Sequence, residues 1–118
     1  MQIQTRLSDQ LSRYLDLAVS ETKVTAENMA NIDTPGYRAQ GFNFEAEMRK
    51  ALATANSQTS PPLRIREVEG LISRADGNNV SMDREGLNLA QAQLKFKTGV
   101  ALMRIENQRV MDAIHVDK

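Results

Sequence analysis

The chain has 118 residues, no cysteine, and fifteen acidic residues that balance fifteen basic ones. This length suits one domain over residues 1–118, the lack of cysteine excludes disulfides and thiol chemistry, and balanced charge argues against a nucleic-acid or anionic-membrane partner. No apolar run approaches the ~20 residues that span a bilayer. Because residues 1–13 lack a basic start and an apolar core, we expect no cleaved secretory signal.

Residues 5–32 are predicted to form one helix with a single apolar face. Apolar or small residues recur there at spacings of three or four, which is typical of an amphipathic helix. The face consists of Leu7, Leu11, Leu15, Ala18, Thr22, Ala26 and Met29. A helix of this kind needs one partner surface.

A turn is predicted directly after this helix. Thr34 precedes a proline and is pushed out of the helical region, and Pro35 cannot continue the backbone ladder. Pro35 and Gly36 suit the two central positions of a type II turn, where Gly36 supplies the positive φ. We expect Asn31 to form a left-handed cap just before the turn.

Residues 38–81 are expected to be largely irregular. The pattern predicts a short helix over 44–53 and a short edge strand over 63–66. Residues 50–75 show no clear period, and the sequence leaves their conformation open. We expect this segment to be mobile in the isolated chain and to become ordered where neighbouring molecules supply a surface.

A second long helix is predicted over 83–115. A turn over 76–79 precedes it, and Ser81 or Asp83 is expected to cap its first turn. Gly99 is the weak point of this helix, because glycine costs about 1 kcal/mol relative to alanine in a helix interior.

This second helix has two apolar stripes on roughly opposite sides. One stripe holds Leu87, Ala90, Leu94, Ala101 and Ile105, and the other holds Leu89, Ala92, Phe96, Val100, Met103, Val110 and Ile114. The first helix can cover only one of them, and an uncovered stripe forgoes ~25 cal/mol per Å² of apolar surface. The second stripe keeps the sevenfold spacing of coiled coils.

We therefore expect the second stripe to contact other subunits. The predicted contact residues are Leu89, Phe96, Val100, Met103, Val110 and Ile114. The alternative is that the middle segment folds back and covers this stripe. In either case the chain is predicted to be all-α, with two long terminal helices packed as an antiparallel pair around a largely irregular middle.

The residues that carry chemistry do not converge in this sequence. The single histidine, His115, lies three residues from the C-terminus, where chains fray. No Gly-rich phosphate loop, hydrolase elbow or zinc motif is present. We expect no catalytic residue, no cofactor, no metal, no small-molecule substrate and no enzyme activity.

Two separated motifs resemble those of bacterial flagellar axial proteins. Asn28, Asn31, Thr34, Pro35, Gly36 and Tyr37 fit the pattern Asn-x-Ala-Asn-x-x-Thr-Pro-Gly-Tyr that follows the first helix of rod and hook subunits. Gly77, Asn78, Val80 and Glu85 fit the Gly-Asn-x-Val-x-x-x-x-Glu element of rod proteins. With the short middle segment, the chain most resembles the FlgB-like proximal rod family, although a sister rod subunit is a near alternative.

The resemblance implies a structural subunit of the basal body rod, which self-assembles through its terminal helices and transmits torque. Implied partners are other copies, other rod subunits, a FliE-type adaptor and the flagellar type III export gate, which passes subunits to the periplasmic rod without a cleaved signal. Phe44 and Met48 match a short gate-recognition pattern, and they equally fit an i, i+4 packing pair. The alternative function is a soluble helical adaptor or export chaperone.

Overall fold

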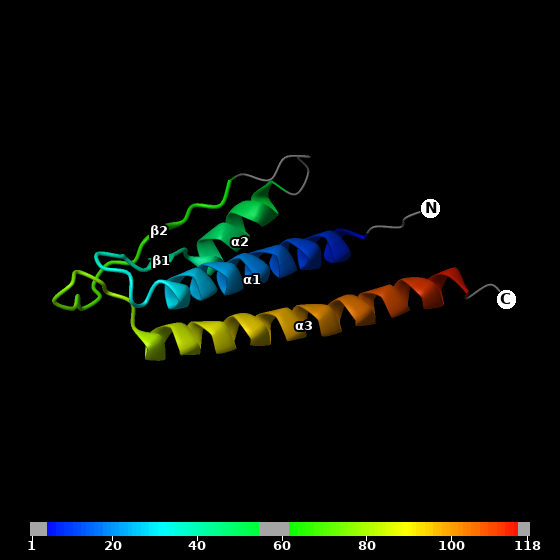
Figure 1. Cartoon of the computed structure of the whole chain (residues 1–118). Helices are drawn as coiled ribbons and strands as arrows, with labels where there is room; N and C mark the ends of the chain where they lie inside the picture. Colours follow the sequence, from blue (N-terminus) through cyan, green and yellow to red (C-terminus); the bar gives the residue numbers. More distant parts are fainter. Residues whose placement is uncertain (1–4, 55–61, 116–118) are drawn as a thin grey trace.

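The structure, a computed structural model, describes residues 5–54 and 62–115. Its elements are α1 (Arg6–Ala30), β1 (Gln40–Gly41), α2 (Phe44–Ala53), β2 (Arg66–Glu67) and α3 (Met82–Ile114). Figure 1 shows α1 and α3 side by side and antiparallel, with α2 on the side of α1 that faces away from α3. The body is elongated, with extents of 69 × 26 × 21 Å. The predicted pair of long terminal helices is therefore confirmed.

Side chains cap the three helices. Thr5 and Ser8 form a capping box at α1, in which each side-chain oxygen accepts from the other residue's backbone N–H at 3.0 Å. Asn43 caps α2, and Ser81 caps α3 by accepting from the backbone N–H of Arg84 at 3.4 Å. Of the two predicted caps for α3, Ser81 is thus the one that is used.

The end of α1 differs from the expectation in one respect. Asn31 is the C-cap, but its φ is −103° and it is not left-handed. Its side-chain amide donates to the carbonyl of Glu27 at 2.8 Å, which adds to the bond that this carbonyl accepts from the backbone N–H of Asn31. The predicted left-handed cap at Asn31 is therefore wrong.

The middle of the chain contains a little more regular structure than its sequence pattern indicated. The predicted short helix is present as α2, and β1 pairs antiparallel with β2, Gln40 opposite Glu67 and Gly41 opposite Arg66. The strand predicted over 63–66 is found at Arg66 and Glu67 instead, because these are the residues that pair with β1. Residues 55–61, part of the stretch left open, lie outside the described residues.

The buried interior is small and contains as much polar as apolar material. Among the described residues, the buried apolar ones are Leu11, Ala18, Val24, Ala39, Val80 and Ala92. The buried polar or charged ones are Thr25, Asn28, Glu47, Asn78, Asn79, Glu85 and Glu106. Hydrogen bonds therefore define the packing of this chain at least as much as apolar burial does.

The two stripes of α3 are covered differently from the expectation. Small residues bring α1 close: Ala92 is fully buried, and a Cβ on Gly99 would lie 2.6 Å from Leu15 Cδ2. This side of α3 carries the stripe that was expected to be left free. It is covered by α1 and not by the middle segment. Its half-buried members are Leu89, Val100, Met103 and Val110.

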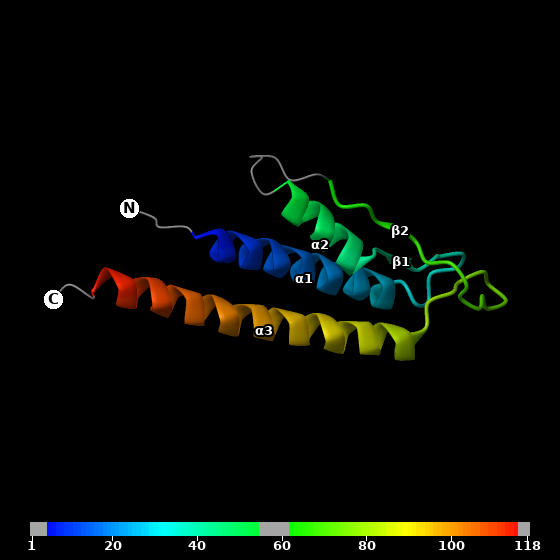
Figure 2. The ribbon, with the colours of Figure 1, turned by 180° about the vertical axis from the view of Figure 1, so that it is seen from behind.

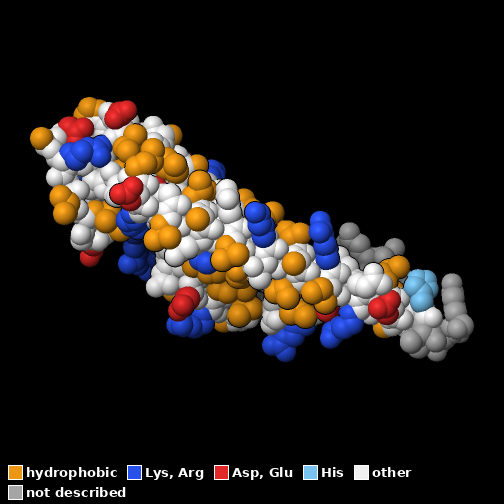
Figure 3. Space-filling model, turned by 90° about the horizontal axis from the view of Figure 1, so that it is seen from below, with side chains coloured by type: hydrophobic (Ala, Val, Ile, Leu, Met, Phe, Trp, Pro, Cys, Tyr) orange, Lys and Arg blue, Asp and Glu red, His pale blue; other side chains and the backbone are white. Residues whose placement is uncertain are grey.

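The stripe left open is the other one. Leu87, Leu94 and Ile105 are 60%, 67% and 64% exposed. Figure 3, which views the molecule from the α3 side, shows apolar side chains along this face and charged ones mainly at its margins. The assignment of the covered and uncovered stripes is thus corrected, because Ala92 and Gly99 allow α1 to approach closely on the other side.

Candidate functional site

The two motifs separated by about forty residues in sequence meet at one pole of the molecule, where α1 ends and α3 begins (Figures 1 and 2). The backbone N–H of Gly36 donates to the carbonyl of Asp76 at 2.8 Å. Gly77 has a φ of +84°, and a Cβ there would lie 3.4 Å from the Cα of Gly36. Glycine is favoured here because L side chains rarely adopt this positive φ, whereas a Cβ would make only an ordinary van der Waals contact with Gly36. We call this region the polar junction, formed by Asn28, Tyr37, Asn78, Asn79 and Glu85.

Asn28, on the last turn of α1, is the centre of the polar junction. Its Nδ2 donates to the carbonyl of Gln40 at 2.8 Å and to the carboxylate of Glu85 at 3.2 Å. Its Oδ1 accepts from the hydroxyl of Tyr37 at 3.2 Å and from the backbone N–H of Gln40 at 2.9 Å. The buried amide therefore joins α1, the turn, β1 and α3, and uses its full hydrogen-bonding capacity.

Asn78 holds the Thr-Pro-Gly-Tyr turn from the other motif. Its Nδ2 donates to the carbonyls of Asn31, Ile32 and Thr34 at 2.9, 3.0 and 2.9 Å. Its Oδ1 accepts from the backbone N–H of Val80 at 2.8 Å. One fully buried amide thus shares its two N–H hydrogens among carbonyls of the C-cap of α1 and of the turn that follows it, and holds the two together.

The turn itself has the predicted geometry. The backbone N–H of Tyr37 donates to the carbonyl of Thr34 at 3.2 Å, and Gly36 has a φ of +75°. Both features are typical of a type II turn with Pro35 and Gly36 at its centre. Thr34, Pro35 and Gly36 are exposed, so the tip of the turn faces outward while Tyr37 points back to Asn28.

Glu85 plays a larger part than its predicted position near a helix start suggested. Its carboxylate is completely buried, and the guanidinium of Arg84 donates to it at 2.7 Å. Together with the Asn28 amide, this partner compensates for the loss of water around the charge. Burial, and then the charges of Glu27 and Glu85, raise the pKa of Tyr37 above its ordinary value of 10.0.

Two arginines that are not among the predicted site residues brace the junction from outside. Arg38 Nε donates to Glu67 at 2.8 Å, and its Nη1 donates to the carbonyl of Gly77 at 3.2 Å. Arg74 donates to the carbonyls of Val80 and Ile32. The position of Arg38 directly after the turn motif was a signal for its role. Arg74 gave no such signal, because a single arginine in an irregular segment is usually a solvated charge.

Phe44 and Met48 lie on α2, which packs on α1. The ring of Phe44 meets that of Tyr14 edge to face, with centroids 5.5 Å apart, and Lys95 Nζ lies 3.9 Å from the Phe44 centroid. Met48 is half-buried. Phe44 therefore has a packing role in the folded chain, and its role at an export gate stays a prediction.

Two apolar surfaces remain open on the helical pair. The outer ridge runs along the free side of α3 and consists of Leu87, Ala90, Leu94, Ala101 and Ile105. The side groove, of about 420 Å³, lies between α1 and α3 and is lined by Val19, Thr22, Lys23, Ala26, Gln93, Phe96 and Lys97. Of the predicted contact residues, Phe96 and Ile114 are exposed, at 41% and 49%, and the other four are half-buried.

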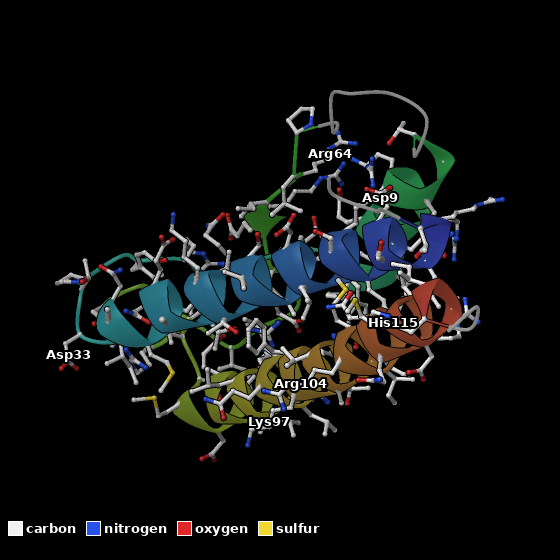
Figure 4. The ribbon with its side chains drawn as sticks, turned by 90° about the vertical axis from the view of Figure 1, so that its right-hand side faces the viewer. Asp9, Asp33, Arg64, Lys97, Arg104 and His115 are labelled. Atoms are coloured by element: carbon white, nitrogen blue, oxygen red, sulfur yellow. The ribbon has the colours of Figure 1, made fainter. Side chains whose placement is uncertain are left out.

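The described part of the chain offers little for catalysis. His115 is exposed at the end of α3, far from the polar junction (Figure 4). Within residues 5–54 and 62–115, no group of three histidine, aspartate or glutamate side chains is placed to hold a metal. None of the helices in these ranges combines the length and the apolar character that a membrane span requires.

Comparison with known proteins gives several relatives of one kind. The flagellar basal body rod protein FlgB of Borrelia hermsii is 31% identical over 108 residues, which cover 75% of this chain and 80% of that protein. FlgB of Salmonella typhimurium is 26% identical over 119 residues, 85% of this chain and 86% of that protein. FlgB of Buchnera aphidicola is 27% identical over 113 residues, 82% and 85% respectively. No family model matches the chain.

Proposed function

Because the chain belongs to the FlgB family of flagellar basal body rod proteins, we propose that it is a structural subunit that builds the proximal rod. Its terminal helices pack against other copies and against sister rod subunits in this proposal. The observation that carries it is the exposed outer ridge of α3, since a lone chain leaves Leu87, Leu94 and Ile105 largely in water. Burial of such side chains is the usual driving force for association.

The small interior supports the same proposal. A rod subunit that folds fully only at its destination needs a monomer of marginal stability, which assembly then stabilises by mass action. The short list of buried apolar residues and the many buried polar ones fit that requirement. Torque transmission follows from position in the rod and is part of the proposal.

We further propose that the subunit reaches the rod through the flagellar export gate and contacts a FliE-type adaptor. Phe44 and Met48 would be read by the gate in the unfolded chain, and Phe44 packs against Tyr14 of α1 after folding. The predicted subunit contacts at Leu89, Val100, Met103 and Val110 are restricted in this proposal to the parts of these side chains that α1 leaves open.

Genetic complementation tests the proposed function. In a flagellated strain that lacks its own proximal rod protein, the chain should restore motility and be present in isolated basal bodies. A chain that is exported but absent from purified basal bodies would contradict the proposal. If the purified chain were a discrete dimer with a sharp two-state melt, a soluble adaptor or export chaperone would be favoured instead.

A substitution at Phe96 separates assembly from folding. Phe96→Asp should leave the helicity of the monomer nearly unchanged, because the side chain is 41% exposed, while rod assembly and motility are lost. Phe96→Leu is the matched control and should retain both, because it keeps an apolar side chain in the groove. Loss of monomer helicity in Phe96→Asp would assign Phe96 to the internal packing of the chain.

A further inference from the structure

Asp76 and Gly77, in the loop that crosses the turn, are the one place in the sequence where an aspartate or asparagine precedes a glycine. We propose that this pair is a site of spontaneous covalent rearrangement from aspartate to isoaspartate, and that the polar junction keeps the site closed in the folded chain. The rearrangement takes place in chains that have not folded or whose junction has opened. The chemistry belongs to the chain itself, so it does not depend on the proposed function.

The rearrangement needs only the two residues and water. The backbone nitrogen of Gly77 bonds to Cγ of Asp76, while the amide proton and the hydroxyl of the protonated carboxyl group leave together as one water molecule. Another water molecule then opens the five-membered succinimide. Opening at Cγ restores aspartate, and opening at the backbone carbonyl makes isoaspartate, in which the main chain runs through Cβ and Cγ. Glycine favours ring closure, because it has no Cβ to hinder the nitrogen and its φ is little restricted.

The fold engages both reacting groups in hydrogen bonds. The Gly77 N–H, which must lose its proton, donates to the carbonyl of Arg74 at 2.9 Å. The carboxylate of Asp76 accepts from the backbone N–H of Asn78 at 3.0 Å, one residue beyond the nitrogen with which it would react. Asp76 is exposed, so water can reach the pair. Hydrogen bonding, and not exclusion of water, is therefore what opposes ring closure in the folded chain.

The backbone on both sides of the reacting nitrogen is also held. The carbonyl of Asp76 accepts from the backbone N–H of Gly36 at 2.8 Å, and the carbonyl of Gly77 accepts from Arg38 Nη1 at 3.2 Å. Because the peptide unit is planar, the Asp76 carbonyl must turn with the Gly77 nitrogen as the ring closes, which disrupts its bond to Gly36. Rearrangement thus requires local opening, and its rate in the folded chain follows the fraction of open molecules.

Isoaspartate at this position is incompatible with the polar junction. It lengthens the main chain by one methylene, about 1.5 Å, just before Gly77. It also turns the carbonyl that accepts from Gly36 into a carboxylate outside the main chain. Asn78, whose side chain holds the carbonyls of Asn31 and Thr34, follows directly and is displaced. A chain that rearranges before it folds should therefore form a less stable structure than the natural chain.

Peptide mapping of the purified full-length chain tests the proposal. The chain is kept at mildly acidic pH in water enriched in heavy oxygen, because each passage through the succinimide adds one heavy oxygen atom. In guanidinium chloride, heavy oxygen and isoaspartate should accumulate at Asp76, and in the folded chain they should accumulate several-fold more slowly. Asp33, exposed in the neighbouring turn and followed by threonine, is the internal control and should not react.

A matched variant checks the chemistry. Asp76→Glu keeps a carboxylate but cannot close a five-membered ring, so it should not rearrange in guanidinium chloride. Equal rates at Asp76 in the folded and unfolded natural chain would overturn the protection by the fold. No conversion of Asp76 in the unfolded chain, or conversion of Asp33 at the same rate, would overturn the site itself.

A variant with a weakened junction tests whether the junction is the shield. Asn78→Ala removes the amide that holds the turn, but it keeps the backbone N–H bound to Asp76. It should rearrange several-fold faster than the natural chain in the same buffer and, if it is unfolded, as fast as the natural chain in denaturant. Ile72→Ala, at a residue 92% exposed in the same loop, is the control and should react at the natural rate. An Asn78→Ala chain as slow as the folded natural chain would overturn the role of the junction.

The rearranged chain itself gives a last measurement. Separated by chromatography and returned to buffer, it should unfold at a lower temperature than the unmodified chain in circular dichroism. Equal melting temperatures would show that the loop accepts the longer backbone and would overturn the incompatibility of isoaspartate with the polar junction.

Discussion

The side-chain amide of Asn28 on α1 donates to the carboxylate of Glu85 on α3, and both side chains are buried. The two residues lie fifty-seven positions apart, at the end of one helix and the start of the other. The same amide holds Tyr37 and Gln40, so one contact links the turn, β1 and both long helices. The two sequence motifs therefore form a single structural unit.

Asn28→Ala should be among the most destabilising single substitutions in the chain. It removes four hydrogen bonds and leaves the buried carboxylate of Glu85 and half-buried groups of Tyr37 and Gln40 without this partner. Because each unsatisfied buried group costs about 1–3 kcal/mol, we expect a loss of at least about 2 kcal/mol in unfolding free energy. Urea unfolding of the monomer measures it. Glu27→Ala, at the exposed preceding position, should change the value by less than about 0.5 kcal/mol.

The two glycines inside α3 should respond oppositely to substitution. Gly86 has open space around it, so Gly86→Ala should raise the unfolding free energy by about 1 kcal/mol through helix propensity. At Gly99 a Cβ would meet Leu15 at 2.6 Å and Tyr14 at 3.1 Å, so Gly99→Ala should gain little and Gly99→Val should lose about 1–3 kcal/mol. Equal stabilisation by alanine at both positions, in thermal or urea melts, would contradict the close approach of α1.

The stability of the chain should fall at alkaline pH. Burial, and secondarily Glu21, raise the pKa of Tyr14, and burial with Glu27 and Glu85 raises that of Tyr37. The unfolded phenols ionise near pH 10 and the folded ones only at higher pH. Both tyrosines therefore contribute stability that is complete below about pH 10 and is lost as the pH rises through their folded pKa values.

A variant without tyrosine isolates this effect. The chain has two tyrosines, so Tyr14→Phe combined with Tyr37→Phe removes every phenol. The unfolding free energy of the double variant should decline less steeply above about pH 10 than that of the natural chain. Parallel curves for the two proteins, followed by circular dichroism, would assign the alkaline loss to lysines or to other groups.

Export should depend on Phe44 and Met48 separately from their packing role. If the gate reads these residues, Phe44→Ala combined with Met48→Ala should reduce secretion of the chain several-fold in a strain that cannot assemble the rod. Leu52→Ala, four residues beyond Met48 and exposed on the same helix, is the control and should be secreted normally. Normal secretion of the double variant would leave the packing of Phe44 on Tyr14 as the sole role of this pair.

The sequence predicted the helices well because their signals are local. Periodic apolar residues, Ser81 as a cap and the Pro35-Gly36 turn each act within a few residues, and all are present in the structure. The position of β2 was not predictable, because a two-residue strand depends on its pairing with Gln40 and Gly41. Local pattern carries no information about such a distant partner.

The face of α3 that meets α1 was assigned wrongly for a similar reason. Large apolar residues do not distinguish the two stripes, because both stripes possess them. The structure selects the face by the small residues Ala92 and Gly99, which allow close approach, and by Glu85 and Glu106, which find partners on α1. The spacing of seven between Ala92 and Gly99 was a signal for this seam, since small residues in register permit close helix packing. Glycine at position 99 was interpreted as a weakness, although it is what allows the contact.

The long helices are tied to each other near both ends of their contact. Asn28 holds Glu85 at the polar junction, and near the opposite end the hydroxyl of Thr5 donates to the buried carboxylate of Glu106 at 2.7 Å. If one helix slid along the other by a single turn, about 5.4 Å, both hydrogen bonds would break. The buried carboxylates of Glu85 and Glu106 would then lose these donors. The chain is consequently stiff against sliding of one long helix along the other, because any such movement separates both carboxylates from their donors.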